Sequence, residues 1–191
     1  RVNGKSIAWL PDDLHKDICK LILNDILLPG DTILITTPFY VKIPGSFSRS
    51  GHKDQAYQVS QWYPKPAVYD RHGWNQMPYL DQGEFYSEFG SFDVTITLPK
   101  NYVVGATGNL VTSEELHWLE EKSKDTSTVR NIPASDSELK IIRYSGRNMH
   151  DFAWFADKRY RVLKGEVLLA GGRKVNTWAM FTEMQKEVWK D

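Results

Sequence analysis

The sequence predicts a mainly β chain, either a β-sandwich or a saddle-like curved sheet, with one or two short helices. Three observations predict this fold class. Roughly eight to ten short segments rich in β-branched and aromatic residues are separated by turn signals. In residues 91–99 (SFDVTITLP) apolar and polar side chains alternate, which is typical of a half-buried strand. No more than two segments carry the signals that begin a helix.

The other expected strands follow from the same signals in chain order. They are residues 6–10, 17–23, 32–37, 39–43, 102–106, 139–144, 160–164, 166–169 and 174–180. Segments 17–23 and 32–37 are expected to form a hairpin, because the turn sequence Leu28-Pro29-Gly30-Asp31 lies between them. Cys19 is expected to be a small core residue of the first of these two strands.

Capping boxes mark the two expected helices. Thr112 heads the first box, and Glu115 is expected to reach back to the Thr112 backbone N–H and begin a helix over residues 113–122. Thr182 heads the second box, in which Gln185 has the same role.

Domain organisation is expected to be simple. Residues 1–180 are expected to form one β domain, and residues 181–191 the start of a helix that is cut short. The opening residues are expected to be the interior of a longer chain, so the sequence carries no targeting information of its own.

Composition narrows the classes of partner. The 24 basic residues balance the 24 acidic ones, and no basic stripe is visible, so we expect no nucleic-acid partner. No apolar run is long enough to cross a bilayer, so we expect no membrane span. Cys19 is the one cysteine, which excludes an intrachain disulfide and a zinc site built on several cysteines.

Catalytic motifs are missing from the sequence, so no catalytic residue, metal ligand or cofactor is expected in this chain. The histidines are too scattered for a His-Glu-x-x-His zinc motif. They are His15, His52, His72, His117 and His150. There is also no Gly-x-Ser-x-Gly elbow and no phosphate-binding glycine loop.

Carboxylates near the aromatic stretch leave several interpretations open. They are Asp70, Asp81, Glu84, Glu88 and Asp93. Paired acids can hydrolyse glycosides, and acids together with backbone oxygens can hold calcium. The simpler interpretation is a solvated rim that keeps an aromatic-rich surface soluble.

Aromatic side chains are concentrated in residues 57–99. Ten of the chain's aromatics lie there, mostly in segments interrupted by proline and glycine. Loops carried by a rigid scaffold are where binding residues collect. We therefore expect an aromatic-rich loop region that leads onto a β-sheet and serves as a binding or docking surface.

Several runs in this region and beyond it form a distinctive pattern. They are SQWYPK at 60–65, AVYD at 67–70, GW at 73–74, PYL at 78–80, QGEFY at 82–86, EFG at 88–90, FDVTITLP at 92–99, VVGATG at 103–108 and DFAWFA at 151–156. The pattern resembles the N-terminal domain of the zinc aminopeptidase superfamily, the gluzincin metallopeptidases of the aminopeptidase N type. The resemblance is strongest to a bacterial branch written with Gln-Trp-Tyr-Pro-Lys, and it covers nearly the whole chain.

The resemblance implies a large saddle-like β domain that packs against its own C-terminal catalytic domain. That following domain would hold the zinc ion through His-Glu-x-x-His and anchor peptide substrates through a Gly-x-Met-Glu-Asn strand. Both motifs are absent from this chain. The parent protein is then expected to be a peptide hydrolase, periplasmic or otherwise exported, while the fragment alone is inactive.

The resemblance also implies site residues. The family often writes one loop as Thr-Gln-x-Glu, whose polar groups bind the free amino end of the substrate, and Ser60-Gln61-Trp62-Tyr63 matches it. Gln61 and Tyr63 are the expected substrate-binding residues, although Tyr63 stands where the family often has an acid. Gln61 has the alternative of a loop-stabilising amide.

Trp62, Trp74 and Tyr79 are expected to form an aromatic docking surface that packs against the catalytic domain. Two alternatives from other classes stay open. One is a carbohydrate-binding β-sandwich that stacks sugars on the same three rings. The other is a protein-interaction module of a larger assembly.

Overall fold

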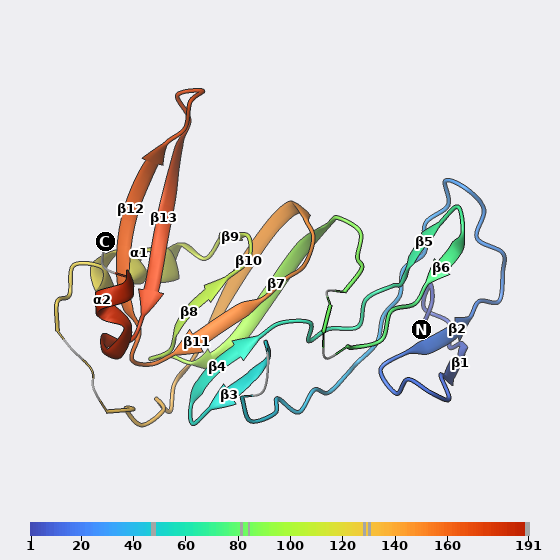
Figure 1. The fold of residues 1–191 in the computed structure, drawn as a ribbon, viewed down its shortest axis with the longest axis horizontal. Helices are drawn as coiled ribbons and strands as arrows, with labels where there is room; N and C mark the ends of the chain where they lie inside the picture. The colour runs from blue at the N-terminus through green and yellow to red at the C-terminus, as the bar shows by residue number, and fades with distance from the viewer. Residues whose placement is uncertain (47–48, 81, 84, 128, 130, 190–191) are drawn as a thin grey trace. The chain divides into compact units, whose positions relative to one another are not determined.

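The computed structural model describes residues 1–46, 49–80, 82–83, 85–127, 129 and 131–189. Its regular structure is mainly β with a few short helices, which confirms the predicted fold class (Figure 1). The chain divides into two compact units. The first unit contains Arg1–Lys42 and Pro64–Glu88, and the second contains Ile43–Tyr63 and Phe89–Asp191.

Two sheets form the centre of the second unit. One has the strand order β7-β10-β9 and the other β3-β4-β11-β8. The strands of the first sheet are β7 (Gly90–Pro99), β9 (Asn109–Leu110) and β10 (Leu139–Met149). Those of the second sheet are β3 (Gly51–Lys53), β4 (Ala56–Val59), β8 (Val103–Ala106) and β11 (Trp154–Asp157).

Strand β7 is the segment with the clear alternation, and it pairs antiparallel with β10 in a register that sets Ile142 opposite Ile96. Because side chains alternate across a strand, this register turns Ile96 and Ile142 to one face of the sheet. The ladder continues until a register shift between Gly146 and Met149.

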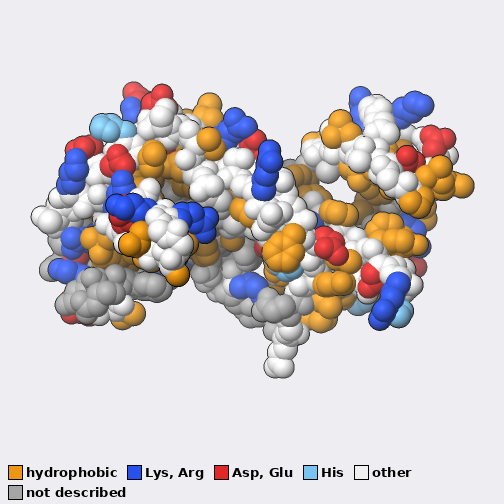
Figure 2. All heavy atoms as spheres, turned by 90° about the horizontal axis from the view of Figure 1, so that it is seen from above, with side chains coloured by type: hydrophobic (Ala, Val, Ile, Leu, Met, Phe, Trp, Pro, Cys, Tyr) orange, Lys and Arg blue, Asp and Glu red, His pale blue; other side chains and the backbone are white. Residues whose placement is uncertain are grey.

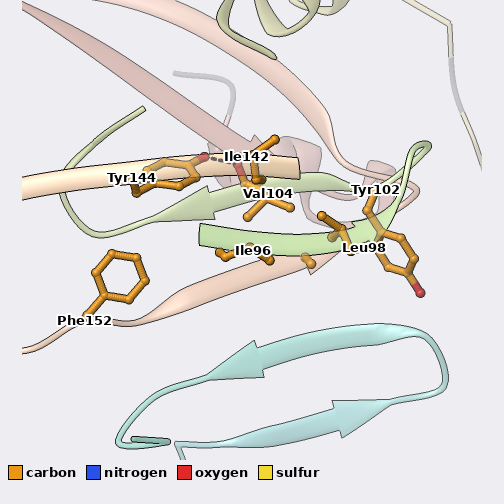
Figure 3. Packing of buried hydrophobic residues seen from close by; sticks show 8 residues of the cluster. Ile96, Leu98, Tyr102, Val104, Ile142, Tyr144 and Phe152 are labelled. Atoms are coloured by element: carbon orange, nitrogen blue, oxygen red, sulfur yellow. Dashed lines mark hydrogen bonds between the residues drawn. The ribbon is translucent and has the colours of Figure 1, made fainter. Parts of the chain in front are cut away.

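The main hydrophobic core lies between the two sheets, as in a β-sandwich. Figure 3 shows its side chains converging from strands of both sheets. Its buried members are Ile96, Leu98, Tyr102, Val104, Ile142, Tyr144, Phe152 and Ala156. Tyr144 is buried together with its hydroxyl, which donates to the Val104 carbonyl at 2.8 Å. That bond satisfies a polar group that burial would otherwise leave without a partner.

A smaller core lies on the opposite face of β8, where Val103 packs with Leu119 and Val162. Leu119 belongs to helix α1 (Ser113–Lys122), which coincides with the predicted helix. Val162 belongs to β12 (Arg161–Leu168), which forms a long hairpin with β13 (Lys174–Phe181) (Figure 1). The two expected strands around Gly165 are therefore one continuous strand.

The expected capping box of α1 is wrong. Thr112 is the N-cap residue, but its side chain makes no cap hydrogen bond. Its hydroxyl instead accepts from the Arg143 backbone N–H at 2.8 Å. Glu115 turns into the protein, where its carboxylate meets the Lys140 ammonium at 2.6 Å. A buried carboxylate needs a partner for its charge, so Glu115 pairs with Lys140 and not with the Thr112 backbone N–H.

The second predicted helix start is closer to the structure. Gln185 reaches back to accept from the Thr182 backbone N–H at 3.4 Å, as expected of a capping box. The chain then forms a single 3-10 turn, Glu183–Gln185, and the short helix α2 (Lys186–Trp189).

The first unit consists of two separate hairpins and irregular chain. Strand β1 (Ala8–Pro11) pairs with β2 (Cys19–Ile22), and β5 (Val68–Asp70) pairs with β6 (Gly73–Asn75). Among the described residues of this unit, Val68 is the only hydrophobic side chain that is fully buried.

Several expectations for this unit are wrong. The partner of the 17–23 segment is the preceding strand β1 rather than residues 32–37, which make only an isolated bridge from Ile35 to Val2. Residues 39–43 are likewise not a strand. Cys19 is exposed rather than part of a core, because both faces of the two-stranded hairpin are open to solvent.

Candidate functional site

The loop that carries Gln61 and Tyr63 follows strand β4 in the second unit and is fixed by two long-range hydrogen bonds. The Trp62 indole Nε1 donates to the Phe152 carbonyl at 3.1 Å, and the Tyr63 hydroxyl donates to Asp151 Oδ1 at 2.6 Å. These bonds join residues that are 90 and 88 positions apart in the chain. The start of the DFAWFA run therefore holds the SQWYPK loop in place.

Tyr63 is half-buried among aromatic rings. Its ring meets Trp62 at 5.5 Å and Phe92 at 5.6 Å, both edge-on, which is the favoured geometry for aromatic pairs. Burial, and next the hydrogen bond to the Asp151 carboxylate, raise the pKa of Tyr63 well above its usual value. The phenol is thus a persistent hydrogen-bond donor and holds its proton toward Asp151.

Gln61 has an uncommon backbone conformation, with a φ of 51° in the left-handed region. The other described non-glycine residues in this region are Asn3, Asp54 and Asn148. Asparagine and aspartate tolerate the conformation because their short side chains bond locally, whereas glutamine has no such compensation. Such strain persists where the surroundings enforce it and is frequent at binding sites. The next two residues, Trp62 and Tyr63, are held by the long-range hydrogen bonds described above.

Trp62 is partly buried and packs against the main core, so most of its ring is used inside the second unit. This packing explains how the loop is anchored. Only the smaller, exposed part of the indole is left to contact an external partner, although the sequence predicted that Trp62 belongs to a docking surface.

Trp74 and Tyr79, the other two expected docking residues, belong to the first unit. Trp74 on β6 is 66% exposed, and its ring meets that of Tyr69 on β5 edge-on at 4.9 Å. Tyr69 is 67% exposed. Val68 lies on the other face of the same hairpin and is buried, so the hairpin presents its two large rings to solvent.

Tyr79 is exposed on about half of its surface, and its backbone N–H donates to the Asp17 carboxylate at 2.6 Å. That contact ties the segment after β6 to the β1–β2 hairpin within the first unit. Figure 2 shows hydrophobic side chains lying among the charged ones on the face that it draws.

The candidate carboxylates that the structure describes have different surroundings. Asp93 forms an ion pair with Arg143, and Asp70 accepts from the His72 backbone N–H at 2.8 Å. Glu88 is exposed, and Asp81 and Glu84 lie outside the described residues. Where the structure is described, no three His, Cys, Asp or Glu side chains are grouped so that they could hold a metal ion.

Two residues of interest have no signal in the sequence that marks them as site residues. Asp151 is there only the acid that begins the DFAWFA run, and Tyr69 is one of the many aromatic residues in 57–99. The alternation of β5 and β6 would have placed Tyr69 beside Trp74 had the hairpin been recognised. No local signal predicts the bond from Asp151 to Tyr63.

In the part of the chain that the structure describes, no helix combines the length and apolar character needed to cross a membrane. No protein-family model, no curated protein and no solved structure matches this chain.

Proposed function

We propose that this chain is the non-catalytic N-terminal domain of a zinc-dependent peptidase, most simply an aminopeptidase. It packs on the catalytic domain and contributes residues to the substrate cleft. The observation that carries the proposal is the resemblance of the aromatic runs, above all SQWYPK at 60–65 with DFAWFA at 151–156.

The geometry supports the proposal at the same two runs. The runs that carry the resemblance are bonded to each other through Trp62 and Tyr63, although they are far apart in the sequence. The bonds hold Gln61 in a strained conformation, and strain of this kind accompanies binding loops. In this proposal the Gln61 side-chain oxygen accepts a hydrogen bond from the amino end of a peptide.

Each part of the enzyme would have its own task. The zinc ion, held by the catalytic domain, would polarise the scissile carbonyl and activate water. The residues of this chain would bind and orient the substrate, which lowers the barrier by fixing the reacting geometry. Among the described residues of this chain, no three His, Cys, Asp or Glu side chains are grouped to hold such an ion.

The coding sequence downstream of Asp191 provides the first test. The proposal expects a Gly-x-Met-Glu-Asn-like strand, then His-Glu-x-x-His, then a later glutamate as third zinc ligand. A downstream region without these ligands would overturn the peptidase proposal.

One observation favours a second candidate function, a carbohydrate-binding module. Tyr69 and Trp74 together present two exposed rings on one face of the β5–β6 hairpin. Sugar rings stack on such faces through their C–H groups. The test is the tryptophan fluorescence of the chain across a panel of glycans, with Trp74→Ala as control. A response that Trp74→Ala abolishes would support the module, and no response to any glycan would remove it.

A further inference from the structure

Asp151, which holds Tyr63 in the candidate site, has no cation beside it among the described residues. It is half-buried, and its hydrogen bond comes from the neutral Tyr63 phenol at 2.6 Å. No lysine or arginine of the described chain forms an ion pair with it, and its second oxygen, Oδ2, has no hydrogen-bond partner among the described residues. Removal of a carboxylate from water without a cation is costly.

The contrast with other buried or half-buried acids of the same unit is clear. Glu115 meets Lys140 at 2.6 Å, and Asp157 meets Arg159 at 2.7 Å. Those acids have their cations within the fold. Asp151 therefore has a negative charge without a cation and one oxygen without a hydrogen-bond partner. A cation from outside the chain would neutralise the charge and donate to that oxygen.

We infer that Asp151 is a specificity-determining residue that binds a cationic ammonium group, with Tyr63 as the positioning residue that orients its carboxylate. The inference rests on the proposed function, in which the ammonium is the free amino end of a peptide. Tyr63 stands where the resemblance implies an acid, and its hydroxyl brings the carboxylate of Asp151 to that place instead.

The arrangement assigns separate tasks to the two side chains. Tyr63 donates to Oδ1 and thereby restricts the orientation of the carboxylate. Oδ2 then accepts from the ammonium, and the Gln61 amide oxygen is available in the same loop as a second acceptor. An N-acetylated peptide has no charge at this position and offers a single weaker donor, so it is expected to bind less well.

The test compares two probes on the 191-residue chain, trialanine amide and N-acetyltrialanine amide. Binding is followed by NMR of labelled tyrosine rings, with the Tyr63 signal assigned from Tyr63→Phe. The free-amine probe is expected to bind about tenfold more tightly than the acetylated one, because a hydrogen bond between charged groups is worth that much. Asp151→Asn is expected to abolish the difference.

Two further variants separate recognition from loss of structure. Asp93→Asn removes a carboxylate elsewhere in the same unit and is expected to leave the preference unchanged. Tyr63→Glu in the Asp151→Asn background returns a carboxylate to the loop and is expected to restore the preference, which a merely structural role of Asp151 would not do. Near-ultraviolet circular dichroism checks that each variant is folded.

Equal binding of the two probes, binding of neither, or a preference that survives Asp151→Asn would overturn the inference. These results are distinct from a failure of the proposed function. A zinc peptidase whose Asp151→Asn variant still prefers free amines would retain the function and lose this inference. Amine binding by a chain with no downstream zinc ligands would support this inference and overturn the proposed function.

Discussion

At the scale of single residues, the chain keeps several tyrosine hydroxyls away from water. Burial is the main cause that raises the pKa of Tyr63 and Tyr144. For Tyr63 the Asp151 hydrogen bond adds to the effect, and for Tyr144 the nearby charge of Glu115 does. Burial also raises the pKa of Tyr102 and Tyr160.

These shifts predict an alkaline limit to stability. A group whose pKa is raised by folding contributes stability that is fully present below its unfolded pKa, which is about 10 for tyrosine, and that is lost as the pH rises through the folded pKa. The free energy of unfolding is therefore expected to fall above about pH 10.

Tyrosinate absorbance measures this effect directly. At about pH 11 the folded chain should show fewer than its nine tyrosines ionised, and denaturant at the same pH should release the remainder. Tyr63→Phe and Tyr144→Phe should each reduce the number of tyrosines that ionise only after denaturant is added. Complete ionisation without loss of the folded-state circular dichroism would contradict this prediction.

At the scale of elements, two adjacent residues of strand β10 differ sharply in burial because they lie on opposite faces of the sheet. Ile142 is 1% exposed and faces the main core, whereas Ile141 is 65% exposed. Ile142→Ala is expected to lower the free energy of unfolding by about 2–5 kcal/mol, because it leaves a cavity between the sheets.

Ile141→Ala is the matched control in the same strand, and its expected cost is below about 1 kcal/mol. Denaturant titration of both variants measures the difference. Equal costs would mean that the register of β7 and β10 is not the one described.

Helix α1 is attached to the sheet by a buried ion pair. Lys140 donates to Glu115 and to the Tyr102 carbonyl, and its ammonium lies 4.1 Å from the centre of the Trp118 ring. Burial raises the pKa of Glu115 and lowers that of Lys140, because it disfavours the charged form of each group. The hydrogen bond and the charge attraction between the two side chains oppose both shifts.

Glu115→Gln leaves the Lys140 charge buried without its carboxylate and is expected to cost about 3 kcal/mol. Glu114→Gln, in the same turn but exposed, is expected to change stability by less than about 0.5 kcal/mol. Thermal unfolding of the two variants provides the comparison. A Glu115→Gln variant as stable as Glu114→Gln would show that the pair does not hold the helix.

The elements that were predicted from sequence are those whose information is local. The alternation of β7 and the length of α1 are written in consecutive residues, so both were found. The capping role of Glu115 was wrong because Lys140 lies 25 residues away and competes for the carboxylate. The strand expected at residues 32–37 has suitable residues but no neighbouring strand to complete its ladder.

For the candidate site too, some residues could be predicted from the sequence and others could not. Gln61 and Tyr63 could be named from a local run, whereas Asp151 could not, because its bond to Tyr63 spans 88 positions. The positive φ of Gln61 likewise has no local signal in the sequence.

At the scale of the whole molecule, the two units differ in how much apolar surface they bury. The second unit has two cores, whereas Val68 is the only fully buried hydrophobic side chain among the described residues of the first. Local opening costs least where few apolar contacts must be broken. Backbone amides of β1 and β2 are therefore expected to exchange with solvent much faster than those of β7 and β10.

Hydrogen exchange of the native chain, read by NMR, tests this in one sample. The β7 and β10 amides serve as the internal reference for global unfolding. Equal protection of the two pairs of strands would contradict the division into units of unequal stability.

The measurement that tests the proposed function most directly is peptide hydrolysis by the protein made from the complete coding sequence around this chain. The proposal predicts bound zinc, hydrolysis that chelation abolishes, and at least a tenfold loss of kcat/KM in Gln61→Ala with the zinc content unchanged, because one hydrogen bond to a charged group is removed. Gln58→Ala on β4 is the control and should retain activity. Absence of zinc-dependent hydrolysis, or full activity of Gln61→Ala, would contradict the assignment of this chain as a cleft-forming peptidase domain.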